Sequence, residues 1–375
     1  MAGRKKCMDI HAALNPLIMI TTILLTATIA MAGDDAVVPA QKSELDKWFN
    51  DIVKPFEQHK SSLDSDLAKA EDGANKVVKV MQSGGDFKTV TEAINSIPAG
   101  NTKRVIIYIG GGTYNEKITI PKDKPFVTLV GDSKNMPKLT FNGDAAKYGT
   151  VDSGTLTVLS DYFVGANLNI INSSPRPDGK REGAQAVALR LSGTKAAMYN
   201  CKMIGFQDTI CDDRGYHFFK DCYVEGTVDF IFGSGKSLYL STQLNVLGDT
   251  GMTAITAQAR DAKTEDTGYS FVHCNITGTG KGTFLGRAWR ASPQVVYAYT
   301  SMGDVISPEG WTDNKHPEYD NSVNFGEYKC IGPGSSMSKR VKFTKELSDA
   351  DAKPYISLGF IEGSKWLLPP PNPKV

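Results

Sequence analysis

Two short segments of this 375-residue chain place an aspartate in the same sequence context. Asp208 follows a glycine by three residues and a cysteine by seven, and Asp229 does the same 21 residues further on. If the fold stacks the two segments, the carboxyl groups lie about 4.8 Å apart, the spacing of neighbouring strands. Two carboxyl groups at that distance cannot easily both ionise, so one tends to keep a proton. The pair would then combine a general acid with a nucleophile or base; the alternative is two turn aspartates that cap backbone amides.

The same repeat predicts the architecture that would position the pair. Weaker copies begin at Leu244 and Cys274, which implies further steps of 22 and 30 residues. Short β-rich runs separated by Gly, Asn and Asp begin at Val105, and long helical patterns are absent from about residue 114 to about residue 343. A period of 20–50 residues with short strands is typical of a solenoid whose ends need covers. We predict an all-β fold, a right-handed parallel β-helix (solenoid) with short capping helices at the ends, rather than a meandering β-sandwich.

The N-terminal region predicts a targeting segment and a helical lead-in. Residues 1–32 combine a basic start, an apolar stretch and a small-residue site at 30–32, the pattern of a cleaved secretory signal peptide. A membrane anchor is less favoured, because the apolar run is short for a span. Residues 33–76 are polar with scattered apolar positions and predict one or two amphipathic helices. Residues 77–370 would form the catalytic domain, with a short helix over 87–97 that covers an open end of the sheet.

Charge, cysteine content and absent motifs exclude several classes of function. The net charge of +1 argues against a general nucleic-acid-binding protein. The chain has no G-x-S-x-G, H-E-x-x-H or C-x-x-C motif, so neither a serine-hydrolase elbow nor a zinc site is indicated. Cys201 and Cys222 share the register of the two aspartates, and we predict a stacked, reduced pair rather than a disulfide. Asn172 and Asn275 are candidate glycan acceptors.

Five ordered motifs between Val77 and Leu368 point to one family. They are Gly112-Thr-Tyr-Asn-Glu116, Gln185-Ala-Val-Ala-Leu189, Gly205-Phe-Gln-Asp-Thr-Ile210, Asp229-Phe-Ile-Phe-Gly233 and Leu285-Gly-Arg-Ala-Trp289. Together they resemble the plant pectin methylesterases (pectinesterases), in the short form that lacks an inhibitor-like pro-region and that includes pollen-type members. Ala288 departs from the family pattern, which has proline between the arginine and the tryptophan, so the geometry around Arg287 is in question.

The resemblance implies a reaction and a role for individual residues. The chain would hydrolyse the methyl esters of homogalacturonan (pectin) to pectate and methanol, as an aspartyl esterase of cell-wall modification. Asp229 would be the nucleophile and Asp208 the general acid and base. Gln207 and Gln185 would donate hydrogen bonds to the oxyanion, and Arg287 would hold Asp229 ionised. The implied substrate contacts are Gln185, Arg287, Trp289, Thr155 and Phe232.

Other interpretations of these residues remain open. Gln185 could be a polar ladder residue, Trp289 a core residue and Arg287 part of a structural ion pair. A second class of function is another β-helical pectin-active enzyme, a lyase or a polygalacturonase, for which an acidic calcium cluster or more than two clustered aspartates is expected. A third is a catalytically inactive wall-binding homologue.

The resemblance also implies the surroundings in which the protein works. It would need no metal and no organic cofactor, and its substrate would be pectin. A proteinaceous pectin methylesterase inhibitor is the expected protein partner, and no nucleic acid or membrane is expected after signal cleavage. The protein would be a monomer, secreted to the cell wall or apoplast and modified as a glycoprotein.

Overall fold

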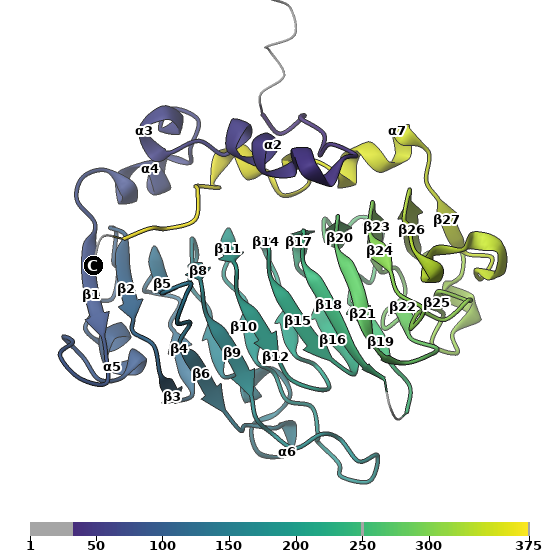
Figure 1. The fold of residues 1–375 in the computed structure, drawn as a ribbon, viewed down its shortest axis with the longest axis horizontal. Helices are drawn as coiled ribbons and strands as arrows, with labels where there is room; N and C mark the ends of the chain where they lie inside the picture. Colours follow the sequence, from purple (N-terminus) through teal and green to yellow (C-terminus); the bar gives the residue numbers. More distant parts are fainter. Residues whose placement is uncertain (1–32, 249–250, 374–375) are drawn as a thin grey trace, which may run out of the picture.

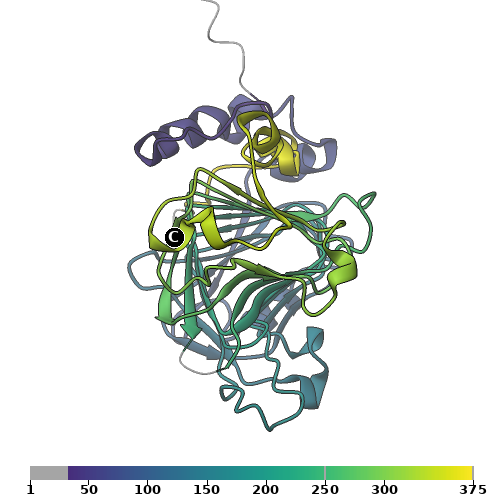
Figure 2. The same cartoon turned by 90° about the vertical axis from the view of Figure 1, so that its right-hand side faces the viewer.

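The computed structural model describes residues 33–248 and 251–373, so the predicted signal peptide at 1–32 lies outside the described residues. Within these residues the chain winds into coils of three short strands, and each strand pairs in parallel with its equivalents on the neighbouring coils. Figure 1 shows the strands standing side by side along the long axis of the molecule, and Figure 2 looks along that axis. The arrangement confirms the predicted parallel β-helix.

Three sheets form the walls of the solenoid. The first sheet contains β1 (Lys76–Val80), β2 (Val105–Ile109), β5 (Val127–Gly131), β8 (Val164–Ala166), β11 (Ala196–Tyr199), β14 (Tyr216–Lys220), β17 (Lys236–Leu240), β20 (Gly268–Val272), β23 (Gln294–Ala298), β26 (Asn324–Tyr328) and β27 (Thr344–Glu346). The second contains β3 (Thr113–Asn115), β6 (Lys138–Phe141), β9 (Asn169–Asn172), β12 (Lys202–Ile204), β15 (Tyr223–Gly226), β18 (Gln243–Gly248), β21 (Asn275–Gly280) and β24 (Ser301–Met302). The third contains β4 (Ile118–Ile120), β7 (Leu156–Val158), β10 (Leu189–Leu191), β13 (Ile210–Asp212), β16 (Val228–Gly233), β19 (Ala254–Gln258), β22 (Phe284–Arg287) and β25 (Trp311–Thr312).

The strand register confirms the strongest sequence repeat and corrects the weaker ones. β12 pairs with β15 so that Lys202 lies opposite Tyr223, the expected step of 21 residues. The next partners along this row are Gln243 and Asn275, which give steps of 20 and 32 residues instead of the expected 22 and 30. The sequence alignment is therefore displaced by two residues at this point. Because side chains alternate with a period of two along a strand, a slip of two leaves the hydrophobic pattern unchanged.

The interior of the solenoid is filled by columns of stacked side chains. Phe219, Tyr239, Phe271 and Tyr297 of the first sheet stack with successive ring centroids 4.3, 4.6 and 4.6 Å apart. Such offset stacks add about 0.5–1.5 kcal/mol per pair beyond the burial of the rings. Neighbouring coils are thus held in register by side chains as well as by the backbone ladder.

The turn between the first and second sheets is built the same way on successive coils. One residue with a positive φ, between 47° and 55°, makes this turn at Asn167, Asn200, Asp221, Ser241, His273, Tyr299 and Lys329. Asn and Asp tolerate this left-handed conformation, and the Asn200 amide donates to the Asn167 side chain at 2.9 Å. The following residue on two neighbouring coils is Cys201 or Cys222, and both are buried free thiols, in agreement with the predicted reduced pair.

Helices cover one end and one side of the solenoid. They are α2 (Leu45–Ile52), α3 (Phe56–His59), α4 (Ser65–Glu71), α5 (Val90–Asn95), α6 (Ala145–Tyr148) and α7 (Asp349–Ala352), with short 3-10 turns at Lys42–Glu44, Val151–Ser153, Pro317–Tyr319, Pro333–Ser335, Met337–Lys339, Lys353–Tyr355, Leu358–Ile361 and Gly363–Lys365. The predicted helix within 87–97 is confirmed as α5, which begins with a Thr89–Glu92 capping box and buries Val90, Ala93 and Ile94.

The lead-in at residues 33–76 forms part of the folded body. Its helices α2, α3 and α4, together with α7, lie along one side of the solenoid in Figure 1, over the outer face of the first sheet. Phe49 of α2 stacks on Phe218 of β14 with ring centroids 5.8 Å apart, and both rings are buried. The side of the molecule that carries α6 is opposite this helical layer in both views.

The two candidate glycan acceptors lie in different environments. Asn172 is 3% exposed, and its amide donates to the backbone carbonyls of Gly143, Ser153 and Val187. A glycan on this nitrogen would remove those hydrogen bonds and could not fit in the buried site. Asn275 is half-buried on the outward side of β21, so it is the acceptor that remains compatible with the folded chain.

Candidate active site

The turns that lead from the second sheet to the third form a column along the solenoid, which we call the catalytic column. Asp208 lies between β12 and β13, and Asp229 lies in β16 on the next coil. Because Ile210 pairs with Ile231, the two aspartates occupy equivalent positions, as the 21-residue repeat predicted. The backbone N–H of Asp208 donates to the carbonyl of Val228 at 3.2 Å and joins the two turns directly.

Both aspartates have an unusual backbone conformation. The φ angle is 67° at Asp208 and 53° at Asp229, in the left-handed region that costs a non-glycine residue about 1 kcal/mol or more. The register between β16 and β19 also shifts after Val228, so Asp229 lies in a β-bulge. Bulges re-aim a side chain and often lie beside active sites. The backbone therefore turns both carboxyl groups out of the alternating pattern of the strands.

The glycines of the repeat are explained by the close approach of the two turns. A Cβ on Gly226 would lie 2.2 Å from the Cβ of Phe230 and 2.6 Å from the carbonyl oxygen of Phe206. A Cβ on Gly205 would lie 2.9 Å from Oγ1 of Thr209. Each glycine therefore lets the chain fold tightly under the aspartate that follows it three residues later.

Burial separates the protonation states of the two carboxyl groups. Asp208 is 8% exposed and Asp229 is 4% exposed. Burial and the neighbouring charge of Asp229 raise the pKa of Asp208 well above its usual range, while the charge of Arg287 opposes this. Burial also raises the pKa of Asp229, and the hydrogen bonds and the charge of Arg287 offset this rise in part. Of the two, Asp208 is therefore the carboxyl group that is favoured to hold a proton, and Asp229 is the one that Arg287 holds towards its ionised form.

Arg287 reaches Asp229 from the end of β22, two coils further along the solenoid. Its Nε donates to Oδ1 of Asp229 at 2.6 Å, and its Nη2 donates to Oδ2, so the contact is bidentate. Nη1 donates to Oδ1 of Asn314 at 3.0 Å, and the ring of Trp289 lies 4.7 Å from the guanidinium carbon. Three contacts thus fix the arginine although Ala288 replaces the proline of the family pattern.

The two glutamines predicted to bind an oxyanion lie in the catalytic column beside Asp208. Both are half-buried, and their backbones are fixed: the carbonyl of Gln207 accepts from Ala186 at 3.1 Å, and that of Gln185 accepts from Ala145 at 2.8 Å. Within the described ranges, neither side-chain amide has a hydrogen-bonding partner in the protein. Both amides are therefore able to donate to a ligand.

The other three of the five predicted substrate contacts lie in different surroundings. Trp289 is 51% exposed, and Phe232 is half-exposed on the outward side of the third sheet, beside Cys211 on the preceding strand. Thr155 is fully buried, and its hydroxyl donates to the carbonyl of Ile171 at 2.9 Å. This hydrogen bond fixes the turn next to the column, so the burial of Thr155 argues against the predicted contact with substrate.

The sequence analysis missed two polar features near the site. Asn314 comes from the loop after β25, and only the fold brings it to Arg287. Asp212 at the end of β13 is fully buried against His217, with 2.5 Å between Oδ1 and Nδ1, and the hydroxyl of Tyr239 donates to its Oδ2 at 2.8 Å. The one available signal was a histidine in a strand whose neighbours are apolar, because a buried histidine requires a partner.

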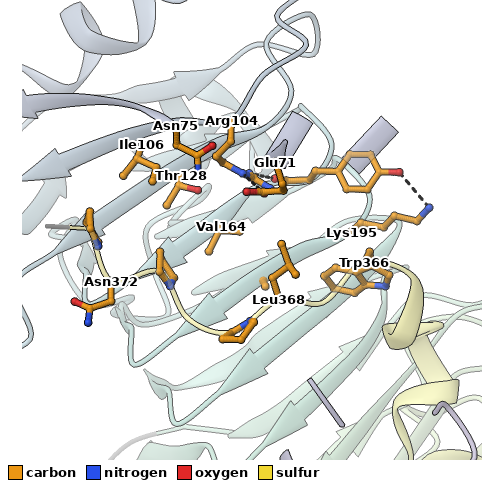
Figure 3. Close-up of a pocket in the computed structure, with 15 residues that line it drawn as sticks. Glu71, Asn75, Arg104, Ile106, Thr128, Val164, Lys195, Trp366, Leu368 and Asn372 are labelled. Atoms are coloured by element: carbon orange, nitrogen blue, oxygen red, sulfur yellow. Dashed lines mark hydrogen bonds and ion pairs between the residues drawn. The ribbon is translucent and has the colours of Figure 1, made fainter. Parts of the chain in front are cut away.

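A separate cavity of about 350 Å³ lies under the C-terminal segment 368–373, on the side of the helical layer (Figure 3). Its floor includes Ile106 and Thr128 of the first sheet, and the Arg104–Glu71 ion pair at 2.7 Å lies at its edge. None of the residues of the catalytic column lines it. Among the residues that the structure describes, no group of three or more His, Cys, Asp and Glu side chains is arranged to hold a metal ion.

Comparison with known proteins identifies a family. The family model described as Pectinesterase matches residues 76–364. Pectinesterase 2 of Olea europaea is 56% identical over 350 residues, which cover 93% of this chain and 95% of the relative.

Solved structures show the same architecture. Pectin methylesterase from carrot superposes with a TM-score of 0.73 and 28% sequence identity, over 79% of this chain and 95% of the other. A pectin methylesterase in complex with a hexasaccharide superposes with a TM-score of 0.67 and 27% identity, over 79% of this chain and 100% of the other. The similarity therefore covers the whole solenoid that carries the column.

Proposed function

The chain belongs to the pectinesterase family, and from that membership we propose how its own residues carry out the reaction. It is a carboxylic ester hydrolase that removes methyl groups from methyl-esterified pectin. The observation that carries the assignment of roles is the asymmetry of the buried pair. Arg287 binds both oxygens of Asp229, whereas the carboxyl group of Asp208 has no hydrogen-bonding partner among the described residues.

In the first half of the reaction, we assign Asp229 as the nucleophile. A carboxylate oxygen of Asp229 attacks the carbonyl carbon of the methyl ester, and the carbonyl oxygen becomes an oxyanion. The side-chain amides of Gln185 and Gln207 donate to that oxyanion, which is stronger as an acceptor than the ground-state carbonyl. Asp208 gives its proton to the departing methoxy oxygen, so methanol leaves and an anhydride joins Asp229 to the uronate.

In the second half, the roles of Asp208 reverse. Its carboxylate, now ionised, takes a proton from a water molecule that attacks the uronyl carbon of the anhydride. The bond to Asp229 breaks, the uronate product carries a free carboxyl group, and both aspartates return to their starting states. Arg287 keeps Asp229 a good leaving group and holds its orientation in both steps. The proposal requires no metal and no organic cofactor.

We extend the proposal to the substrate contacts and to the setting of the enzyme. Gln185, Arg287, Trp289 and Phe232 would contact the pectin chain, and the exposed ring of Trp289 would stack on a sugar. None of the described helices is long and apolar enough to cross a membrane. Residues 1–32 would be a cleaved signal, 33–76 the helical lead-in and 77–370 the catalytic domain of a monomer secreted to the cell wall. A proteinaceous inhibitor of these enzymes would be its protein partner.

Methanol release from highly esterified pectin by the purified protein tests the proposal. The same reaction mixtures would be followed for new reducing ends and for unsaturated sugar ends, the products of a polygalacturonase and of a lyase. We expect methanol alone. Chain cleavage without methanol would favour another β-helical pectin-active enzyme, and binding without any product would favour an inactive wall-binding homologue.

A further inference from the structure

The catalytic column continues past Gln185 towards the N-terminal coils of the solenoid. Helix α6 lies in the turn between β6 and β7, two coils before Asp208, and Lys117 lies one coil further, in the turn between β3 and β4. At one strand spacing per coil, these positions lie about 10 Å and 14 Å from Asp208 along the axis. The Ala145 amide of α6 donates to the Gln185 carbonyl at 2.8 Å, so the helix is attached to the site.

Two ammonium groups gather around one aromatic ring at this end of the column. Nζ of Lys117 lies 5.6 Å from the centroid of the Tyr148 ring, and Nζ of Lys147 lies 5.1 Å from it. Phe141 packs against the same ring with centroids 5.7 Å apart, so Tyr148 is held in place although it is half-exposed. We call these residues, Lys117, Lys147 and Tyr148, the lysine–tyrosine cluster.

The cluster lacks the negative charge that accompanies every other lysine–ring contact in the described ranges. Lys60, Lys195, Lys220, Lys236 and Lys329 also lie over aromatic rings, and each has a carboxylate within 3.2 Å. Neither Lys117 nor Lys147 has a carboxylate within 4.0 Å in that part of the chain.

The nearby acidic side chains are already engaged. Asp144 is bound by Arg181 at 2.6 Å, and Glu116 accepts from two backbone amides at the start of α5, both at 2.9 Å. Two like charges beside one ring repel each other, and here no internal anion compensates them. A bound anion beside the two ammonium groups would compensate their charge.

We propose that the lysine–tyrosine cluster is a subsite for an unesterified uronate residue of the substrate chain, an inference that rests on the proposed function. The free carboxylate would pair with the ammonium groups of Lys117 and Lys147 beside the half-exposed ring of Tyr148. A methyl ester is uncharged and gains nothing from the ammonium groups. The enzyme would therefore distinguish an ester at Asp229 from a free acid three to four coils away.

The test compares two uronate oligomers of equal length, one fully methyl-esterified and one partly de-esterified. In the double variant K117Q/K147Q, which removes both charges and keeps side-chain length, methanol release from the partly de-esterified oligomer should fall about 5- to 10-fold in kcat/KM. Release from the fully esterified oligomer should change less than about twofold, because no ion pair is lost there. Inhibition by fully de-esterified oligomer should weaken by the same factor and become insensitive to salt.

The control variant is K202Q, an exposed lysine on the outer side of β12 with neither a carboxylate nor a ring partner among the described residues. This variant should leave unchanged the kcat/KM for methanol release from both oligomers and the inhibition by the fully de-esterified oligomer. An equal loss on both oligomers, or no loss on either, would overturn the subsite. Failure of the proposed function would look different, since the wild-type protein would then release no methanol from the fully esterified oligomer.

Discussion

Strand β13 separates two buried aspartates with opposite surroundings. Asp212 at its end is fully buried, and both of its carboxylate oxygens are bound, by His217 and by Tyr239. Asp208 just before the strand is 8% exposed, has no hydrogen-bonding partner for its carboxyl group in the described ranges, and lies beside Asp229. A buried carboxylate that is saturated by donors stabilises a fold, whereas an unsaturated one stores energy that chemistry can use. Burial alone does not distinguish a structural carboxyl group from a reactive one, whereas its hydrogen-bonding partners do.

The backbone shows the same contrast. Asp208 and Asp229 have positive φ angles, whereas Asp212 lies in a regular strand. A positive φ and a carboxyl group without a hydrogen-bonding partner in the described ranges therefore occur together at Asp208, and both are absent at Asp212, four residues away. Such clustering is expected at sites where activity is maintained at the expense of stability.

The largest effect should come from the column itself. We expect Asp229→Asn to lower kcat for methanol release by about 10⁴-fold or more, because it removes the nucleophile. Asp208→Asn should lower kcat by about 10²- to 10⁴-fold, the contribution of a positioned general acid. Kinetics on variants that match the wild type in circular dichroism and melting temperature would check this, and a folded variant with normal activity would rule out the two-aspartate mechanism.

Replacing Asp212 or Asp208 by alanine tests how much each carboxyl group contributes to the stability of the fold. Asp212→Ala leaves Nδ1 of His217 and the Tyr239 hydroxyl without partners in a buried site, so the free energy of unfolding should fall by about 3–5 kcal/mol. Asp208→Ala should change it by less than about 1 kcal/mol, because no hydrogen bond of the carboxyl group is lost. Denaturant titration measures both.

The variant Asp212→Asn separates the loss of hydrogen bonds from the loss of the negative charge. Its amide can donate to Nδ1 of His217 and still accept from Tyr239, so it should destabilise less than Asp212→Ala and leave the activity per folded molecule unchanged. Equal losses for Asp212→Ala and Asp208→Ala would show that the contrast between the two sites is not one of hydrogen bonding.

The sequence predicted the parts of the site that repeat. Asp208 and Asp229 could be placed together because identical segments stack one coil apart, and the confirmed solenoid follows from the same repeat. Asn314 could not be placed, because it comes from a loop whose length differs from that of every other turn in its column. Nor does hydropathy show which polar residues of a strand face inward, so the buried His217 was not anticipated.

The role of Thr155 stays a prediction for the same physical reason. A family motif gives the residue type but not whether the hydroxyl faces substrate or a backbone carbonyl. The lysine–tyrosine cluster was also invisible, because its members come from the turns of two coils with unequal lengths.

Removing Arg287 should shift the pH dependence of the pair. Arg287 holds down the pKa of Asp229 by hydrogen bonding and charge, and that of Asp208 by charge. In Arg287→Gln both pKa values rise, and that of Asp229 rises more because it loses the hydrogen bonds as well as the charge of Arg287. Asp229 then ionises only at higher pH, so the acid limb of the kcat/KM profile moves up, and the alkaline limb set by Asp208 follows. An unchanged acid limb with only a lower plateau would mean that Arg287 acts on substrate binding rather than on Asp229.

A smaller shift in the same direction should follow from changes at Asn314. Asn314→Ala removes one of the contacts that fix Arg287, and we expect about a 3- to 10-fold loss in kcat with a slight upward move of the acid limb. Asn314→Asp places a second carboxylate on the guanidinium and should move that limb further. The matched control is Lys315→Ala, the next residue, which shares the positive φ but has no contact with Arg287. If the control and Asn314→Ala behave alike, the loop conformation rather than the hydrogen bond is responsible.

The smallest effect is expected from the cysteines that share the register of the aspartates. Cys201 and Cys222 are stacked on the same two coils, but both lie inside the solenoid, where burial raises the pKa of Cys201 to about 12 and that of Cys222 well above its usual range. They are therefore neutral thiols, and Cys→Ala at either position should cost about 1 kcal/mol through a small cavity without changing kcat. Alkylation should label them only after unfolding. Mass spectrometry of well-folded, non-reduced protein would check this. A peptide that links residues 201 and 222 would show that the two cysteines form a disulfide and would contradict the predicted reduced pair. The register that brings two carboxylates together for chemistry would then also join neighbouring coils covalently beside the site.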